Sequence, residues 1–145
     1  MSNYKKIIVA IDFNAEHEKV IKRALTVCQS PDDLSLVYVS MPVIYIQPFL
    51  YGAEYNSISD FEAVGIATKR LEAIADKFGI NNKNVHVKTG DVSDEIKQIA
   101  NENEADLIVI GTHGRSGIKI LLGSTANAVL HGVKQDVLAV RMHES

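Results

Sequence analysis

Continuous runs of apolar, mostly β-branched residues recur along the chain and predict buried strands. The runs at Ile7–Ile11, Leu36–Val39 and Leu107–Ile110 contain no charged residue. Continuous apolarity is typical of parallel strands that are covered on both faces. The shorter, half-polar run Val85–Val87 predicts an edge strand, and Val137–Val140 is the last apolar run.

Between these strands, apolar residues recur at helical spacing and predict four helices. Gly79 and Gly132 follow two of these stripes and are typical of helix ends. Asp91 and Ser93 begin the third helix, where we expect them to act as caps. The predicted helices span 15–29, 60–79, 93–103 and 124–131. In the first two, the apolar stripes are Val20, Ile21, Ala24, Leu25 and Cys28, and Phe61, Val64, Leu71, Ile74, Ala75 and Phe78. In the last two they are Ile96, Ile99 and Ala100, and Val129 and Leu130.

The alternation of strands and helices predicts an α/β fold with one parallel sheet, helices on both faces and right-handed crossovers. The 145 residues correspond to a single domain. One segment, 41–59, does not fit this pattern. It holds two prolines and several aromatic residues, and we expect it to pack on the domain and to help cover a pocket or a partner: Pro42, Tyr45, Pro48, Phe49, Tyr51 and Tyr55.

The composition and charge of the chain argue against several classes of protein function. The chain is 46% hydrophobic and 23% charged, which is ordinary for a globular protein. A net charge of -3 argues against binding nucleic acid through a basic surface. The apolar runs are too short for a signal peptide or a membrane helix. A single cysteine, Cys28, excludes a disulfide framework, and the histidines show no metal-ligand spacing, so we expect a cytoplasmic protein without a metal of its own.

The candidate chemistry lies at the carboxyl ends of the strands, where ligands bind in open parallel sheets. Asp12 follows the first strand, and the glycine-rich segment Gly111–Thr125 follows the fourth. Glycines let backbone N–H groups approach an anion, Arg115 adds a cation, and Ser124 or Thr125 would begin the last helix with its unpaired N–H groups. This pattern favours a phosphate site, with Asp12 accepting hydrogen bonds from a base or sugar. An ordinary turn followed by an N-cap remains the alternative.

At this point the sequence resembles the universal stress protein family, in its UspA-like branch. The resemblance covers nearly the whole chain except 41–59, and it implies one domain over residues 1–145 with 41–59 as a variable crossover. It implies a five-stranded sheet of order 3-2-1-4-5 and a homodimer made by antiparallel pairing of the fifth strands, here Val137, Leu138, Ala139 and Val140. The segments that carry the resemblance are Val9–Asp12, Thr89–Asp91, Ala105–Gly114, Gly123–Thr125 and Asp136–Arg141.

Some members of that family bind ATP, and the resemblance implies which residues would do so here. Asp12 and Val39 would hold adenine and ribose, and Mg²⁺ would arrive only with the nucleotide. One departure stands out, because eight residues, Arg115–Leu122, separate Gly114 from Gly123 where the ATP-binding pattern has nine. The residues that would hold the phosphates are Gly111, Gly114, Arg115, Gly123, Ser124 and Thr125.

Two hypotheses therefore stay open. The first is a dimeric cytoplasmic stress-response module that binds ATP, ADP or AMP. The second is a nucleotide-free interaction protein that contacts an unknown protein partner through 41–59. No catalytic set is recognisable, since the G-x-S-x-G motif is missing, and we expect at most weak ATP hydrolysis. A phosphotransfer receiver is disfavoured because Asp12 has no acidic neighbour and no lysine follows Val140.

Overall fold

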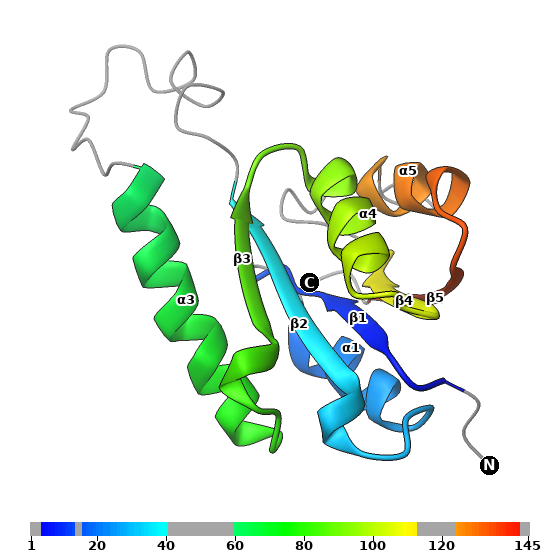
Figure 1. The fold of residues 1–145 in the computed structure, drawn as a ribbon, viewed down its shortest axis with the longest axis horizontal. Coiled ribbons are helices and arrows are strands. Elements are labelled where there is room, and N and C mark those ends of the chain that lie inside the picture. The colour runs from blue at the N-terminus through cyan, green and yellow to red at the C-terminus, as the bar shows by residue number, and fades with distance from the viewer. Residues whose placement is uncertain (1–3, 14–15, 41–59, 113–123, 143–145) are drawn as a thin grey trace.

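Five parallel strands form an open sheet in the order β3-β2-β1-β4-β5 in the computed structural model, which describes residues 4–13, 16–40, 60–112 and 124–142 (Figure 1). Every neighbouring pair of strands is parallel. The predicted strand order and the edge position of β3 are confirmed. The strands are β1 (Ile7–Ala10), β2 (Leu34–Ser40), β3 (Val85–Thr89), β4 (Leu107–Gly111) and β5 (Asp136–Val140).

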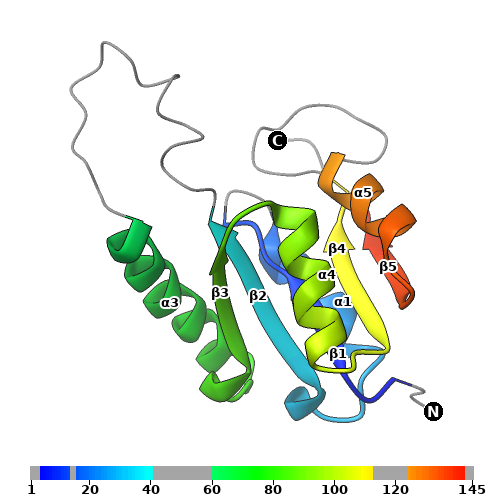
Figure 2. The ribbon, with the colours of Figure 1, turned by 45° about the horizontal axis from the view of Figure 1, so that its top comes forward.

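Two pairs of helices cover the two faces of the sheet (Figure 2). Because neighbouring strand residues point to opposite faces, Ile7 and Val9 pack against one pair while Ile8 packs against the other. No helix in the described part of the chain is both long and apolar enough to cross a bilayer. One face carries α1 (His17–Leu25) and α3 (Asp60–Lys77), and the other carries α4 (Val92–Glu102) and α5 (Ser124–Gly132). Two short 3₁₀ turns, η1 (Pro31–Asp33) and η3 (Asn82–Asn84), precede β2 and β3.

The first helix is shorter than the predicted span of 15–29. It ends at Leu25, and the Thr26 hydroxyl donates to the carbonyl of Arg23 at 2.6 Å. Ser30 then caps η1. Cys28 consequently lies outside the helix and is half-buried against the core, and this burial raises the pKa of its thiol.

Two residues assigned to core-facing stripes are exposed instead. Phe61 is 87% exposed, whereas Leu71 on the same helix is fully buried. Phe61 lies in the first turn of α3, about 15 Å along the helix axis from Leu71, so the two residues can share a stripe while only Leu71 is covered. Leu130 is 45% exposed because its neighbour Val129 occupies the inward position of α5.

Candidate functional site

Three of the predicted ligand residues come together at the carboxyl edge of adjacent strands. The N–H of Ile11 donates to the carbonyl of Val37 at 2.8 Å, so the pairing of β1 and β2 continues to the residue before Asp12. Asp12 is half-exposed at this edge. The Val39 side chain is buried under α4, and Gly111 is the last residue of β4, which pairs with β1 on its other side.

The remaining predicted phosphate residues belong to the segment between β4 and α5. Gly114, Arg115 and Gly123 lie outside the described residues. Ser124 and Thr125 are the first two residues of α5, and their side chains lie outside the described part as well. In Figure 2, α5 begins on the side toward which the β4 arrowhead points, so its first-turn amides lie at the same edge as Gly111.

The four residues predicted to form a dimer contact make up most of β5, which is the last strand of the sheet on its side. Val140 is buried, Val137 and Leu138 are half-buried, and Ala139 is exposed. One side of β5 pairs with β4, and the other faces no strand of the described chain. Such an edge presents backbone N–H and C=O groups to a further strand.

Gly111 has a packing role that the sequence did not reveal. A Cβ atom at this position would lie 3.1 Å from both Cγ and Sδ of Met142, whose side chain is 4% exposed. Met142 thus fills the space beside the glycine. A signal for it was present, because Leu138, Val140 and Met142 continue the period-two apolar pattern of a strand.

Thr112 joins the ends of β4 and β5. Its N–H donates to the carbonyl of Val140 at 3.0 Å, and its Oγ1 accepts from the N–H of Met142 at 3.1 Å. The Thr112 side chain is buried, as expected for a polar group whose hydrogen bonds are made inside the protein. The segment that leads into the glycine-rich stretch is therefore fixed to the chain that leaves β5.

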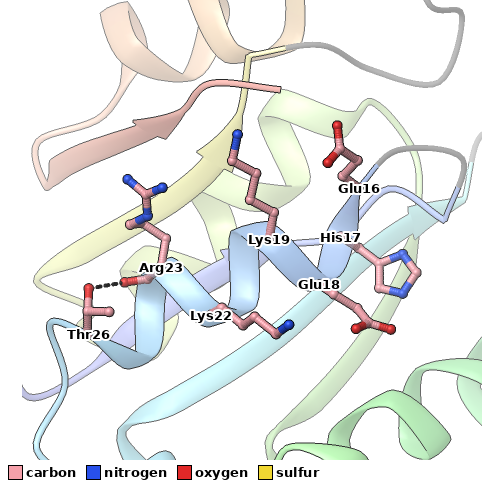
Figure 3. Close-up of a pocket in the computed structure, with 7 residues that line it drawn as sticks. All are labelled: Glu16, His17, Glu18, Lys19, Lys22, Arg23 and Thr26. Carbon is pink, nitrogen blue, oxygen red and sulfur yellow. Dashed lines mark hydrogen bonds between the residues drawn. The ribbon is translucent and has the colours of Figure 1, made fainter. Parts of the chain in front are cut away.

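The ammonium group of Lys19, from α1, contacts the segment that follows β5. The Nζ of Lys19 donates to the carbonyl of Arg141 at 2.5 Å. Figure 3 shows Lys19 and Arg23 on one side of α1 and Glu18 and Lys22 on the other. An open depression runs along this helix, and no predicted ligand residue lines it; its walls are Glu16, His17, Glu18, Lys19, Lys22, Arg23 and Thr26.

Phe13 anchors the chain directly after Asp12. Its ring stacks on Tyr38 of β2 with 4.3 Å between centroids and 26° between planes. The guanidinium carbon of Arg70, from α3, lies 4.3 Å from the centroid of the same ring. A cation over an aromatic face is attractive. This three-layer stack holds the segment that carries Asp12 and was missed because its partners lie far apart in sequence.

Two acidic residues in the segments that carry the resemblance have structural partners. Asp91 caps α4, as expected, by accepting from the N–H of Asp94 and the hydroxyl of Ser93, both at 3.0 Å. These two donors hold the pKa of Asp91 below its usual value. The carboxylate of Asp106 accepts the N–H groups of Lys5 and Lys6, both at 3.0 Å, and so fixes the entry into β1.

Titratable groups elsewhere in the described part of the chain have separate, local partners. His86, in edge strand β3, is half-buried, and this burial lowers the pKa of its imidazole. Glu18 and Lys77 form an exposed ion pair at 2.7 Å, which lowers the pKa of Glu18. Within the described ranges, no three or more His, Cys, Asp and Glu side chains lie close enough together to hold a metal ion.

Comparison with known proteins gives a consistent result. Residues 3–141 match the model of the universal stress protein family. The chain is 37% identical to universal stress protein A homolog 2 of Coxiella burnetii. The 150 aligned residues cover 100% of both chains. In structure it is similar to universal stress protein UspA from Lactobacillus plantarum, with a TM-score of 0.70 and 20% identity over 97% of this chain and 100% of that one.

A further solved structure shares the fold and contains a nucleotide. It is a universal stress protein in complex with cAMP, with a TM-score of 0.56 and 22% identity over 97% of this chain and 98% of that one. At this level of identity the similarity supports the architecture of β1–β5 and their helices.

Proposed function

This chain belongs to the universal stress protein family, and from that premise we propose that it is a cytoplasmic stress-response module that binds an adenine nucleotide at the carboxyl edge of β1 and β4. One observation carries the proposal. Asp12, Val39, Gly111 and the first turn of α5 come from four different elements and meet at one edge. A member of the family with the same fold is known in complex with cAMP, an adenine nucleotide.

In this proposal, each element has a separate task. The carboxylate of Asp12 accepts hydrogen bonds from the ribose hydroxyls, since a charged acceptor makes the stronger bond. Because the side chain of Val39 is only 3% exposed, adenine meets the backbone at this position. The phosphates lie against Gly111, the glycine-rich stretch and the first-turn N–H groups of Ser124 and Thr125 at the positive end of α5. Any Mg²⁺ enters with the phosphates.

We further propose that the functional unit is a homodimer joined through β5. The position of β5 at the end of the described sheet and the exposed Ala139 support it, because an apolar edge strand tends to pair with another chain. Antiparallel pairing about a two-fold axis would bring Val137–Val140 of both copies together. The lone thiol of Cys28 suits a reducing compartment such as the cytoplasm.

Isothermal titration calorimetry with ATP, ADP and AMP tests the nucleotide site. We expect saturable binding by the unchanged protein and an affinity about tenfold or more lower in Asp12→Ala, since hydrogen bonds to a charged group contribute about 1.5–3 kcal/mol. Asp32→Ala is the matched control, because it removes an exposed carboxylate before the start of β2, at the opposite edge. Absence of heat with all three nucleotides would refute the proposal.

The eight-residue spacing between Gly114 and Gly123 favours a second candidate, a nucleotide-free interaction protein. Phe61 supports this candidate, since an aromatic side chain that is 87% exposed follows directly on 41–59 and offers apolar surface to a partner. Mass spectrometry of protein purified without added ligand separates the two candidates. A copurified adenine nucleotide argues for the first, and its absence together with silent calorimetry argues for the second.

A further inference from the structure

A single peptide group, between Arg141 and Met142, is held from two sides. Its carbonyl accepts from Nζ of Lys19 at 2.5 Å, and its N–H donates to Oγ1 of Thr112 at 3.1 Å. The first contact comes from α1 and the second from the end of β4. We call these two hydrogen bonds the 141–142 clamp.

The clamp lies between the two surfaces of the proposed function. On one side, Gly111 and Thr112 lead into the glycine-rich stretch. On the other, Val140 ends β5, the proposed dimer strand, and also accepts the N–H of Thr112 at 3.0 Å. The Met142 side chain packs tightly beside Gly111, where an added Cβ would lie 3.1 Å from its Cγ and Sδ. Residues 111–112 and 140–142 therefore contact one another through both backbone and side chains.

Because the two hydrogen bonds involve one peptide group, they cannot change independently of each other. The group is planar, so its C=O and N–H point in fixed, opposite directions. A shift of Thr112 reorients the N–H of Met142. The same rigid plane then moves the carbonyl of Arg141, which accepts from Lys19 and follows directly on the last residue of β5. Leaving the buried N–H without an acceptor is costly, which favours a joint movement of both segments.

We propose that Thr112 and Lys19 are positioning residues that couple nucleotide binding at the carboxyl edge of β1 and β4 to pairing of β5 with a second copy of the chain. The coupling rests on the proposed function, since it needs both a nucleotide and a dimer. Each binding event selects the same placement of residues 111–112 against 140–142, so each favours the other. By linkage, the effect is reciprocal.

The test measures the dimer dissociation constant by analytical ultracentrifugation, with and without saturating ADP. In the unchanged protein, we expect ADP to lower this constant by about fivefold or more, the lower end of typical coupling between sites. Thr112→Val keeps the side-chain size but removes the acceptor. The dimer dissociation constant of this variant should be about the same with and without ADP. Thr112→Ser keeps the acceptor and should restore the ADP effect. A merely structural role would lower the melting temperature of Thr112→Val without changing the ADP effect.

Lys19→Met supplies a second arm, because the Lys19 bond is exposed and we expect the fold to tolerate its loss. We expect a reduced ADP effect in Lys19→Met and an unchanged one in Lys22→Met, the matched control from the other side of α1. An ADP effect in Thr112→Val or Lys19→Met equal to that of the unchanged protein overturns the coupling alone. A dimer that binds ADP with no effect on dissociation also overturns it. Failure of the unchanged protein to bind ADP, or to dimerise, overturns it together with that part of the proposed function.

Discussion

At the scale of single residues, the carboxyl edge combines groups that face a ligand with groups that only hold the edge in place. Asp12 belongs to the first kind in our proposal. Phe13 and Met142 belong to the second, because their contacts are made inside the protein with Tyr38 and Gly111. Substitutions of the two kinds should therefore separate affinity from stability.

Asp91 gives a residue-scale prediction on stability. Asp91→Ala removes the cap of α4 and should lower the free energy of unfolding by about 1 kcal/mol at pH 7. Because the pKa of Asp91 is lowered in the folded state, its charge stabilises the fold above the usual aspartate value of about 3.9, and this contribution is lost as the pH falls through the lowered value. Urea unfolding at pH 7 and about pH 3 checks it.

The difference between wild type and Asp91→Ala should shrink at the lower pH. Asp91→Asn is the control, since asparagine caps nearly as well but carries no charge. It should retain most of the stability at pH 7 and lack the acid-dependent part. A difference between wild type and Asp91→Ala that does not depend on pH would contradict this account of the cap.

Local signals predicted the single residues whose partners lie nearby in sequence. Asp91 was identified as a cap because the two donors to its carboxylate, on Ser93 and Asp94, lie within three residues. Lys19 and Thr112 were not identified, because their partners are 122 and 30 residues away and only the fold brings them together. The same reason hid the stack of Arg70 on Phe13.

At the scale of elements, α3 tests how glycine acts in two different backbone settings. Gly65 lies inside the helix, and an added Cβ would have no atom within 4 Å. Gly79 follows the helix with a φ of 73°, in the left-handed region, while the N–H of Ile80 donates to the carbonyl of Ala75 at 2.9 Å. This geometry is typical of a glycine C-cap.

Alanine at these two positions should have opposite effects. Gly65→Ala should raise the free energy of unfolding by about 0.5–1 kcal/mol, since alanine is the better helix former. Gly79→Ala should lower it by about 1–2 kcal/mol, because a Cβ is strained in the left-handed region. Thermal unfolding monitored by circular dichroism checks both variants, each serving as the control for the other. Shifts of the same sign would contradict the described end of α3.

The apolar runs predicted the three central strands, because a strand buried on both faces has few polar positions, and shorter runs predicted the two strands at the ends of the sheet. Helix limits were less accurate. The span 15–29 was too long, since the capping box of Ser30 and Asp33 begins a separate turn. Phe61 and Leu130 were assigned to the core from spacing alone, whereas only the packed sheet determines which part of each helix is covered.

At the scale of the whole molecule, the strand order followed from resemblance, since local sequence does not specify which strands are neighbours. The pair of β1 and β4 is what brings Asp12 and Gly111 to one edge. The dimer stays a prediction, because its evidence would lie in contacts between two chains. The nucleotide site likewise stays a proposal, with Gly114, Arg115 and Gly123 outside the described residues.

A charge placed on β5 tests the dimer. Ala139→Glu puts an acidic group on the exposed position of this strand, where antiparallel pairing brings the two copies close together. Like charges facing each other across strands destabilise pairing by about 1 kcal/mol, so the dimer dissociation constant should rise by about fivefold or more. Ala128→Glu, on the exposed side of α5, is the control. Equal dissociation constants for the two variants in analytical ultracentrifugation would contradict a β5 interface.

The most direct test of the central claim is an NMR titration of the ¹⁵N-labelled full chain with ADP, followed through its backbone amides. We expect saturable shifts concentrated at the carboxyl edge, at Asp12, Gly111, Thr112 and Ser124, while the amides of η1 at the opposite edge keep their positions. No saturable change at millimolar ADP, or changes confined to the outer side of α1 or to β3, would contradict the account.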